Sequence, residues 1–112
     1  MSDCIFCKIA SREMPSTIVD ESEKLITIKD INPQAPTHLL IIPKEHFPTI
    51  LECTDKTLLG DMLTTANRLA EEQGFAQKGF RTVINTNEEG GQIVRHLHMH
   101  LLAGRPLSGK MG

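Results

Sequence analysis

The sequence predicts one α+β domain in which an antiparallel sheet of about five strands packs against one long helix. Three observations support this fold class. Short runs of β-branched and apolar residues lie on both sides of one long amphipathic segment, turn-forming residues separate these runs, and 112 residues suffice for one core of modest size. We therefore expect a single domain over residues 1–112, with a mobile tail at residues 105–112.

The N-terminal segment CIFCKIAS predicts a short helix. Ile5, Phe6 and Ile9 have the spacing of one or two helical turns. We expect Pro15 to end this helix, because a proline moves the preceding residue out of the α region.

The next segments predict three strands. STIVDES at residues 16–22 and KLITIKD at residues 24–30 are rich in β-branched residues and predict a hairpin. NPQAPTH contains two prolines and predicts a loop. HLLIIP at residues 38–43 is almost wholly apolar, which is typical of a central strand.

Residues 53–75 predict the long helix, with Thr54 or Asp55 as its N-cap and Gly74 near its end. Apolar residues spaced by three and four form a stripe that we expect to pack on the sheet. The stripe contains Leu58, Leu59, Met62, Leu63, Ala66, Leu69 and Ala70.

Two strands are predicted after the helix, FRTVINT at residues 80–86 and IVRHLHMHLLAG at residues 93–104. The segment between them, NEEGGQ, predicts a turn because its two glycines permit positive φ angles.

Composition excludes several classes of function. The net charge is −2 and basic residues are scattered, which argues against binding to nucleic acid. No apolar run approaches the roughly 20 residues of a membrane helix, and the N-terminus lacks a signal-peptide pattern. Three cysteines, with Cys4 close to Cys7, do not suit a disulfide framework. We therefore predict a cytoplasmic protein with reduced thiols, no membrane partner and no nucleic-acid partner.

Three of the five histidines alternate in RHLHMHLLAGR, so His96, His98 and His100 would share one face of a strand. A lone histidine would most simply be a hydrogen-bonded side chain, and His-x-His can also bind a catalytic zinc ion. A third interpretation is nucleophilic catalysis by imidazole. Residues two apart on a strand are roughly 6.6 Å apart, so the outer two cannot easily share one metal ion. The glycine turn could bind an anion through its N–H groups, which favours phosphate chemistry.

The segment HLHMHLL matches His-φ-His-φ-His-φ-φ, where φ is an apolar residue, and so resembles the histidine triad (HIT) nucleotide hydrolases and transferases. The resemblance is to their Hint-like adenosine phosphoramidase branch. It extends through CIFCKI, EMP, IKDINPQAPTHLLIIPKEH, VINTNEEGGQ and HLHMHLLAGRPL. It implies a HIT-like fold and a homodimer whose sheet continues across both subunits, joined through the long helix or the FRTVINT strand.

The resemblance also implies hydrolysis of purine nucleoside 5′-monophosphoramidates, such as amides of AMP or GMP, through a nucleotidyl-histidine intermediate. His98 would be the nucleophile, a protonated His100 would contact the phosphate, and His38 would be the fourth histidine of the site. The nucleophile would need a hydrogen bond from its other ring nitrogen, typically to a backbone carbonyl. The phosphate would also be held by Asn85 and by the backbone around Gly91 and Gln92.

By the same resemblance, Asp30 would accept hydrogen bonds from both ribose hydroxyls. The walls around the base would be apolar, although core packing is the alternative interpretation for these residues and is equally favoured for Ile9. The expected wall residues are Phe6, Ile9, Met14, Ile28 and Ile31.

Two features depart from the family pattern. Many Hint-like proteins have a serine hydroxyl two residues after the Gly-Gly pair, where this chain has Ile93. The tail also lacks the Trp-Pro-Pro ending of some relatives, so neither the proton donor to the leaving amine nor amine selectivity follows from the resemblance.

Cys4-x-x-Cys7 has the short spacing of half a zinc site, although two core side chains or a redox dithiol would give the same pattern. Some HIT proteins complete such a site with a histidine after the central strand and with the first triad histidine. The resemblance thus implies structural zinc on Cys4, Cys7, His46 and His96, with no catalytic metal.

Three functions remain from the sequence: the phosphoramidase, a purine-nucleotide-binding regulatory protein with incidental hydrolysis, and a zinc hydrolase built on the triad. The last is disfavoured because Cys4, Cys7 and His46 offer zinc a better site.

Overall fold

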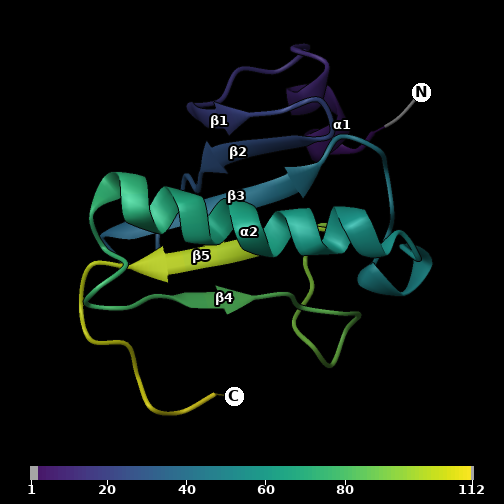
Figure 1. Cartoon of the computed structure of the whole chain (residues 1–112). Coiled ribbons are helices and arrows are strands. Elements are labelled where there is room, and N and C mark those ends of the chain that lie inside the picture. Colours follow the sequence, from purple (N-terminus) through teal and green to yellow (C-terminus); the bar gives the residue numbers. More distant parts are fainter. Residues whose placement is uncertain (1–2, 112) are drawn as a thin grey trace.

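A computed structural model describes residues 3–111 and confirms the α+β fold. Its sheet has five antiparallel strands in the order β1-β2-β3-β5-β4 (Figure 1). The elements, in chain order, are α1 (Ile5–Ala10), β1 (Ile18–Glu21), β2 (Leu25–Lys29), β3 (Thr37–Pro43), the 3₁₀ turn η1 (Ile50–Glu52), α2 (Lys56–Gln73), β4 (Arg81–Val83) and β5 (Met99–Ala103).

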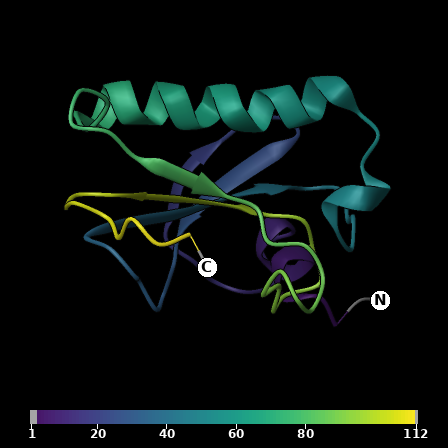
Figure 2. The same cartoon turned by 90° about the horizontal axis from the view of Figure 1, so that it is seen from below.

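The central strand β3 is buried on both faces because a helix covers each of them, as Figure 2 shows for α2 on one side and α1 on the other. Leu39 and Ile41 belong to the apolar cluster that packs against α2. Leu40 and Ile42 alternate with them and pack with the α1 side chains. This two-sided packing explains the continuous apolar run in the sequence.

The long helix α2 begins and ends as predicted. Asp55 is the N-cap, and its carboxylate accepts a hydrogen bond from the Leu58 N–H at 3.0 Å. Gly74 ends the helix in the left-handed conformation with φ 85°. The predicted stripe is buried except at its edge, where Leu59 is partly buried and Leu63 is 52% exposed, so the assignment of Leu63 to the core was wrong.

The short helix α1 ends earlier than predicted, at Ala10 rather than near Pro15. The Ser11 N–H donates to the Cys7 carbonyl, and Arg12 then adopts a positive φ of 69°. The left-handed residue therefore leaves the helical path before the proline can act.

The last two strands are shorter than predicted. β4 covers only Arg81–Val83, and β5 begins at Met99, so His96 and His98 lie outside the strand. The reason is a competing hydrogen bond, because the Leu97 N–H donates to the Phe47 carbonyl at 2.7 Å instead of continuing the β5 ladder. The prediction that all three triad histidines share one strand was wrong.

The sheet edges concern the predicted homodimer, and the C-terminal segment concerns the predicted mobile tail. Both stay predictions. β4 and β1 are the edge strands, so a second copy could continue the sheet at β4. Within the expected mobile tail, the Arg81 side chain donates to the Ser108 carbonyl, and Gly112 lies outside the described residues.

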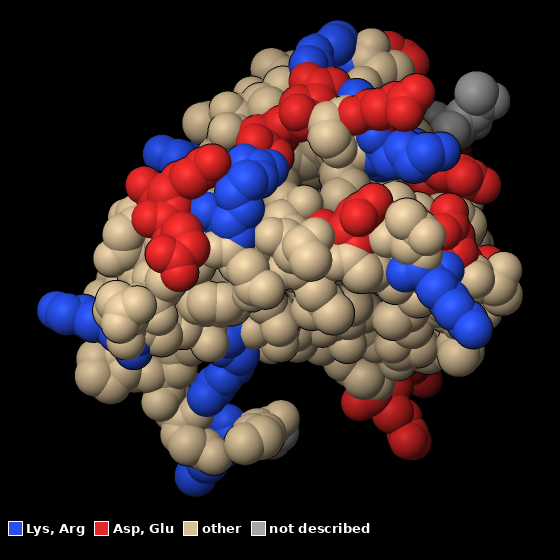
Figure 3. All heavy atoms as spheres, viewed as in Figure 1, with Lys and Arg blue, Asp and Glu red and all other residues tan. Residues whose placement is uncertain are grey.

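Acidic and basic side chains intermingle over the face that α2 covers (Figure 3). Within residues 3–111, no helix is long and apolar enough to cross a membrane.

Candidate functional site

A cavity of about 540 Å³ opens between α1, the end of β2, the loop before β3 and the segment that precedes β5. It brings together every predicted catalytic and substrate-binding residue except Gln92. Its walls contain Ile5, Phe6, Ile9, Met14, Pro15, Ser16, Ile28, Lys29, Asp30, Ile31, Asn32, Gln34, His38, Leu40, Asn85, Gly91, Ile93, Val94, His98 and His100.

His98 lies in this cavity with only 7% of its surface exposed. Its Nδ1 is 2.7 Å from the His96 carbonyl oxygen, which can only accept, so the ring proton is on Nδ1. Burial lowers the pKa of His98, opposed by that hydrogen bond and by the Asp30 charge. The imidazole is therefore neutral near pH 7 and Nε2 has a lone pair, as a nucleophile requires.

His38 and His100 form a hydrogen-bonded pair whose tautomers can be assigned from its neighbours. The Gln34 backbone N–H donates to His38 Nδ1 at 3.0 Å, so a neutral His38 has its proton on Nε2. This Nε2 is 2.9 Å from His100 Nδ1, which must then accept. The proton of His100 is consequently on Nε2, where it can donate to a ligand.

In the free cavity, the surroundings of His100 disfavour the protonated form that was expected to contact the phosphate. Burial, together with the neighbouring His98 and His38, lowers the pKa of His100 to about 4, against the charge of Asp30, which raises it. Burial likewise lowers the pKa of His38, against the charge of Asp30. Near pH 7 His100 can therefore act as a neutral hydrogen-bond donor and not as a cation.

Asp30 follows β2 and lies half-buried at the cavity wall. Its Oδ1 accepts from the Asn32 N–H at 2.8 Å, and its Oδ2 is 3.3 Å from His38 Nε2. A carboxylate has about four acceptor positions, so acceptor capacity remains for two hydroxyls.

The five predicted wall residues all line the cavity, but they differ in burial. Phe6, Ile9 and Ile28 are buried and also belong to the core cluster beneath α1, so core packing is confirmed for them and their role as walls around a base stays a prediction. Ile31 is 88% exposed and forms part of the rim.

Gln92 is the one predicted substrate-binding residue outside the cavity lining. Its side-chain amide donates to the carbonyls of Pro48 at 2.7 Å and Val94 at 3.0 Å. Its Oε1 accepts from the Asn87 N–H at 2.9 Å. The side chain thus holds the turn against the body of the protein.

In the turn that was expected to bind an anion, two N–H groups donate to carbonyls of the turn itself. The N–H of Gly91 donates to the Glu88 carbonyl, and that of Gln92 donates to the Asn87 carbonyl, each at 3.0 Å. These donors are used within the turn, and Gly91 contributes its positive φ of 82° to the same compact conformation.

A second group of side chains lies beside the cavity and joins residues that are far apart in sequence. Cys4, Cys7, His46 and His96 place their ligand atoms within 4.8 Å of one another. Nδ1 of His96 is 3.1 Å from Nδ1 of His46 and 3.2 and 3.6 Å from the Cys4 and Cys7 sulfur atoms, and Nδ1 of His46 is 3.4 Å from the Cys7 sulfur. Tetrahedral zinc with bonds of 2.0–2.3 Å would separate its ligands by about 3.3–3.8 Å, so the donor set and spacing fit this ion.

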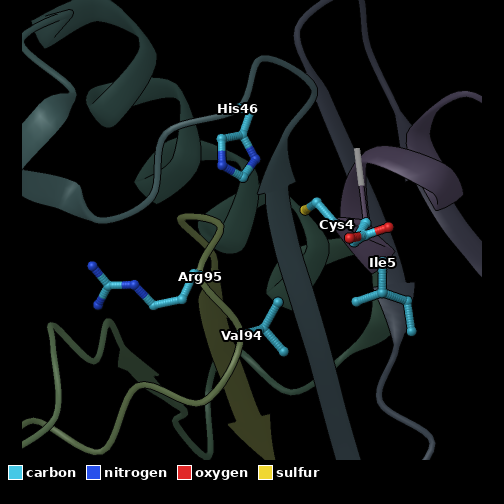
Figure 4. A pocket seen from close by; sticks show the side chains of 6 residues that line it. Cys4, Ile5, His46, Val94 and Arg95 are labelled. Carbon is cyan, nitrogen blue, oxygen red and sulfur yellow. The ribbon is translucent and has the colours of Figure 1, made fainter. Parts of the chain in front are cut away.

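His96 is oriented for ligation by a backbone carbonyl. Its Nε2 is 2.7 Å from the Pro43 oxygen and must donate, which leaves the lone pair of Nδ1 among the sulfur atoms. Figure 4 shows Cys4 and His46 at a smaller cavity of about 430 Å³. Its other lining residues are Asp3, Ile5, Val94 and Arg95.

The sequence reasoning missed the backbone of Gln34, which sets the tautomer of His38. A compact loop is indicated by the two prolines of NPQAPTH, yet composition does not show which N–H turns toward the histidine. It also missed Val94, which lines both cavities.

Comparisons with known proteins place these features in a family. The model of the HIT domain matches residues 11–107. A purine nucleoside phosphoramidase of Escherichia coli (strain K12) is 49% identical over 107 residues, covering 94% of this chain and 90% of that protein.

Solved structures give the same result. A HIT family hydrolase from Legionella pneumophila Philadelphia 1 has a TM-score of 0.95 at 47% identity, covering 98% of this chain and 100% of the other. A zinc-bound histidine triad family protein from Mycobacterium smegmatis has a TM-score of 0.82 at 32% identity, covering 92% of this chain and 76% of the other.

Proposed function

Because the chain belongs to the HIT family, we propose that it hydrolyses the P–N bond of purine nucleoside 5′-monophosphoramidates. The observation that carries the proposal is the tautomer of His98, whose Nε2 lone pair is available in a cavity that also holds a carboxylate and two further imidazoles. The name of the Escherichia coli relative supports this substrate class.

The substrate would lie along the cavity in three parts. The base packs between the apolar walls around Phe6, and the ribose hydroxyls donate to Asp30. The phosphate then lies beside His98, where His100 Nε2 and the Asn85 side chain are the polar groups available to its oxygens.

The reaction proceeds in two displacements at phosphorus. His98 Nε2 forms a bond to the α-phosphorus while the P–N bond breaks, and the amine leaves with the bond pair and gains a proton. The ring becomes cationic, which its Nδ1–H bond to the His96 carbonyl stabilises. Water then forms a bond to phosphorus and loses a proton to solvent while the P–Nε2 bond breaks and its electron pair returns to the ring. This step releases the nucleoside monophosphate and neutral His98.

The proposal includes zinc as a structural ion held by Cys4, Cys7, His46 and His96. When bound, zinc would cross-link α1, the segment after β3 and the segment before β5, with no open coordination position. The zinc-bound relative supports this assignment. The hydrogen bond from His96 to the Pro43 carbonyl fixes the ligating nitrogen.

Turnover of a fluorogenic adenosine phosphoramidate by chelator-treated wild type and His98→Ala tests the function. We expect the substitution to lower turnover by on the order of a thousandfold or more, because the nucleophile is lost. AMP affinity, measured by calorimetry, should change by less than about tenfold. Wild-type turnover in the His98→Ala variant would contradict the mechanism, and binding without turnover by wild type would favour the nucleotide-binding regulatory protein.

Asp30→Asn is the matched variant for that experiment. It should weaken AMP binding by about tenfold or more, because a charged acceptor becomes a neutral amide, while turnover at saturation changes less. A fall in the saturated rate alone would contradict the ribose assignment.

The homodimer remains part of the proposal. The edge position of β4 and the exposed Leu63 on α2 are the surfaces that suit a two-fold contact. Light scattering should report twice the chain mass at micromolar concentration, and a stable monomer would contradict the dimer.

A further inference from the structure

Ile93 is a large apolar side chain that remains 91% exposed although it lines the catalytic cavity. Its neighbours extend the apolar surface, because Val94 and Ile5 line both this cavity and the smaller one beside the Cys/His cluster. Figure 4 shows Arg95 extending away from Val94 and Ile5, and its guanidinium donates to Asn87 Oδ1 at 2.7 Å.

The direction of the reaction indicates which part of the substrate lies near Ile93. In a displacement at phosphorus, the attacking and leaving atoms lie roughly in line on opposite sides. His98 lines the cavity and is only 7% exposed, so an amine opposite its attacking nitrogen would leave toward solvent. Ile93 lines the same cavity but is 91% exposed, in the segment that also contributes Gly91 and Val94 to the wall.

The polar side chains of the cavity come from residues other than 93 and 94, namely Ser16, Lys29, Asp30, Asn32, Gln34, His38, Asn85, His98 and His100. Asp30 and Lys29 come from the end of β2, and the imidazoles of His38 and His100 pair with each other. Gln92, which precedes Ile93, turns its amide toward the Pro48 carbonyl and away from the cavity. The surface offered to the amine from residues 93–94 is therefore apolar.

We propose that Ile93 is a specificity-determining residue that favours leaving amines with an apolar substituent. This inference rests on the proposed function and names the substrate class of the same site. An amine with an alkyl chain would cover Ile93 and Val94, whereas a polar chain of equal length would lose hydration without gaining a partner. Each buried methylene contributes enough hydrophobic free energy for about a fourfold preference.

The test compares two amides of AMP whose amines have equal length, n-butylamine and 2-methoxyethylamine. kcat/KM is measured for both with wild type, Ile93→Ser and Leu51→Ser. Leu51 is the control because it is 67% exposed on η1 and does not line the cavity. We expect the ratio of butyl to methoxyethyl amide to fall about fourfold in Ile93→Ser and to stay unchanged in Leu51→Ser.

The variant-to-wild-type comparison cancels the intrinsic reactivity of the two amides. Hydrolysis of both amides with the same ratio in wild type and Ile93→Ser would overturn this inference and leave the proposed function intact. Failure of wild type to hydrolyse either amide would instead overturn the proposed function.

A binding measurement tests the role of Ile93 independently of the hydrolysis reaction. In the His98→Ala background, calorimetry of the uncleaved amides should show the same fourfold change in the affinity ratio on Ile93→Ser. An unchanged ratio there would overturn the inference without any turnover.

Discussion

The Cys/His cluster and the triad cavity contain neighbouring histidines of one short segment, yet they arrange ring nitrogens in opposite ways. In the cluster, Nδ1 of His96 faces the Cys4 sulfur at 3.2 Å and Nδ1 of His46 at 3.1 Å, so potential metal ligands converge. In the cavity, Nδ1 of His100 faces the donor Nε2 of His38 at 2.9 Å. The first arrangement suits a cation, and the second is satisfied by a hydrogen bond.

Backbone carbonyls produce this difference. The Pro43 carbonyl holds the proton of His96 on Nε2, whereas the His96 carbonyl holds the proton of His98 on Nδ1. Two histidines separated by one residue are therefore opposite tautomers. Residue type identifies a histidine as a candidate, and the carbonyl beside each ring determines which nitrogen can react.

The comparison also bears on a second possible metal group. Asp30, His38 and His100 place their ligand atoms within the same 4.8 Å limit as the Cys/His cluster. Here, however, His38 Nε2 carries a proton that it donates to His100, since its Nδ1 accepts from the Gln34 N–H. Ligation would require breaking this chain, so the Cys/His cluster is the better zinc site.

The largest expected effect comes from removing the cluster's thiolates. Protein purified without added metal or chelator should contain about one equivalent of zinc, and the Cys4→Ser, Cys7→Ser double variant less than about a tenth. Because zinc binding stabilises the folded state, the melting temperature should fall by roughly 10 °C or more. Elemental analysis and thermal unfolding measure the two effects.

Cys53 supplies the control, since it is buried away from the cluster and Cys53→Ala should retain zinc. Wild-type protein with less than about a tenth of an equivalent would contradict the metal assignment and return Cys4 and Cys7 to the core. Hydrolysis should decline in the double variant only as far as the segment around His96 loses its position.

A smaller effect is expected from pH, because the cavity favours neutral imidazoles. Burial and the neighbouring His98 and His38 lower the pKa of His100 to about 4, and burial also lowers the pKa of His98. The unfolded chain therefore binds more protons between about pH 4 and 6.5, so stability falls as the pH drops through this window. kcat/KM should be nearly constant from about pH 6.5 to 8 and fall toward pH 4.

Asp30→Asn sharpens this prediction. The negative charge of Asp30 raises the pKa of His38, His98 and His100 against the effect of burial. Its removal should shift the acid limb of the profile to lower pH, whereas a shift to higher pH would contradict the charge effect.

Sequence patterns predicted what depends on local or periodic information. The N-cap Asp55 and the left-handed Gly74 were identified because their chemistry is local. The sheet followed from short apolar runs, and the triad and cluster residues followed from the family resemblance. Leu63 was misassigned because a helical period marks a stripe without showing how wide the facing sheet is.

The details that decide the chemistry depend on contacts between distant parts of the chain. The Leu97 N–H bonds to the Phe47 carbonyl, and this contact ends β5 before the first two triad histidines. The orientation of Gln92 likewise depends on the distant Pro48 carbonyl. Neither hydrogen bond can be predicted from the local sequence. The strand bounds and the histidine tautomers could therefore be assigned only from the structure.

The position of α1 has a consequence for the order of folding during synthesis. The helix has six residues, too few to persist alone in water. Some of its partners are on β2 and β3, but the His96 that contacts its N-cap Cys4 lies 92 residues further along. Phe6 also packs edge-on against the rings of His96 and His98. The apolar contacts of α1 with β2 and β3 can therefore form early in synthesis. Its contacts with His96 and His98 must wait until nearly the whole chain has emerged, so the cavity and the Cys/His cluster are completed together in one late, long-range closure.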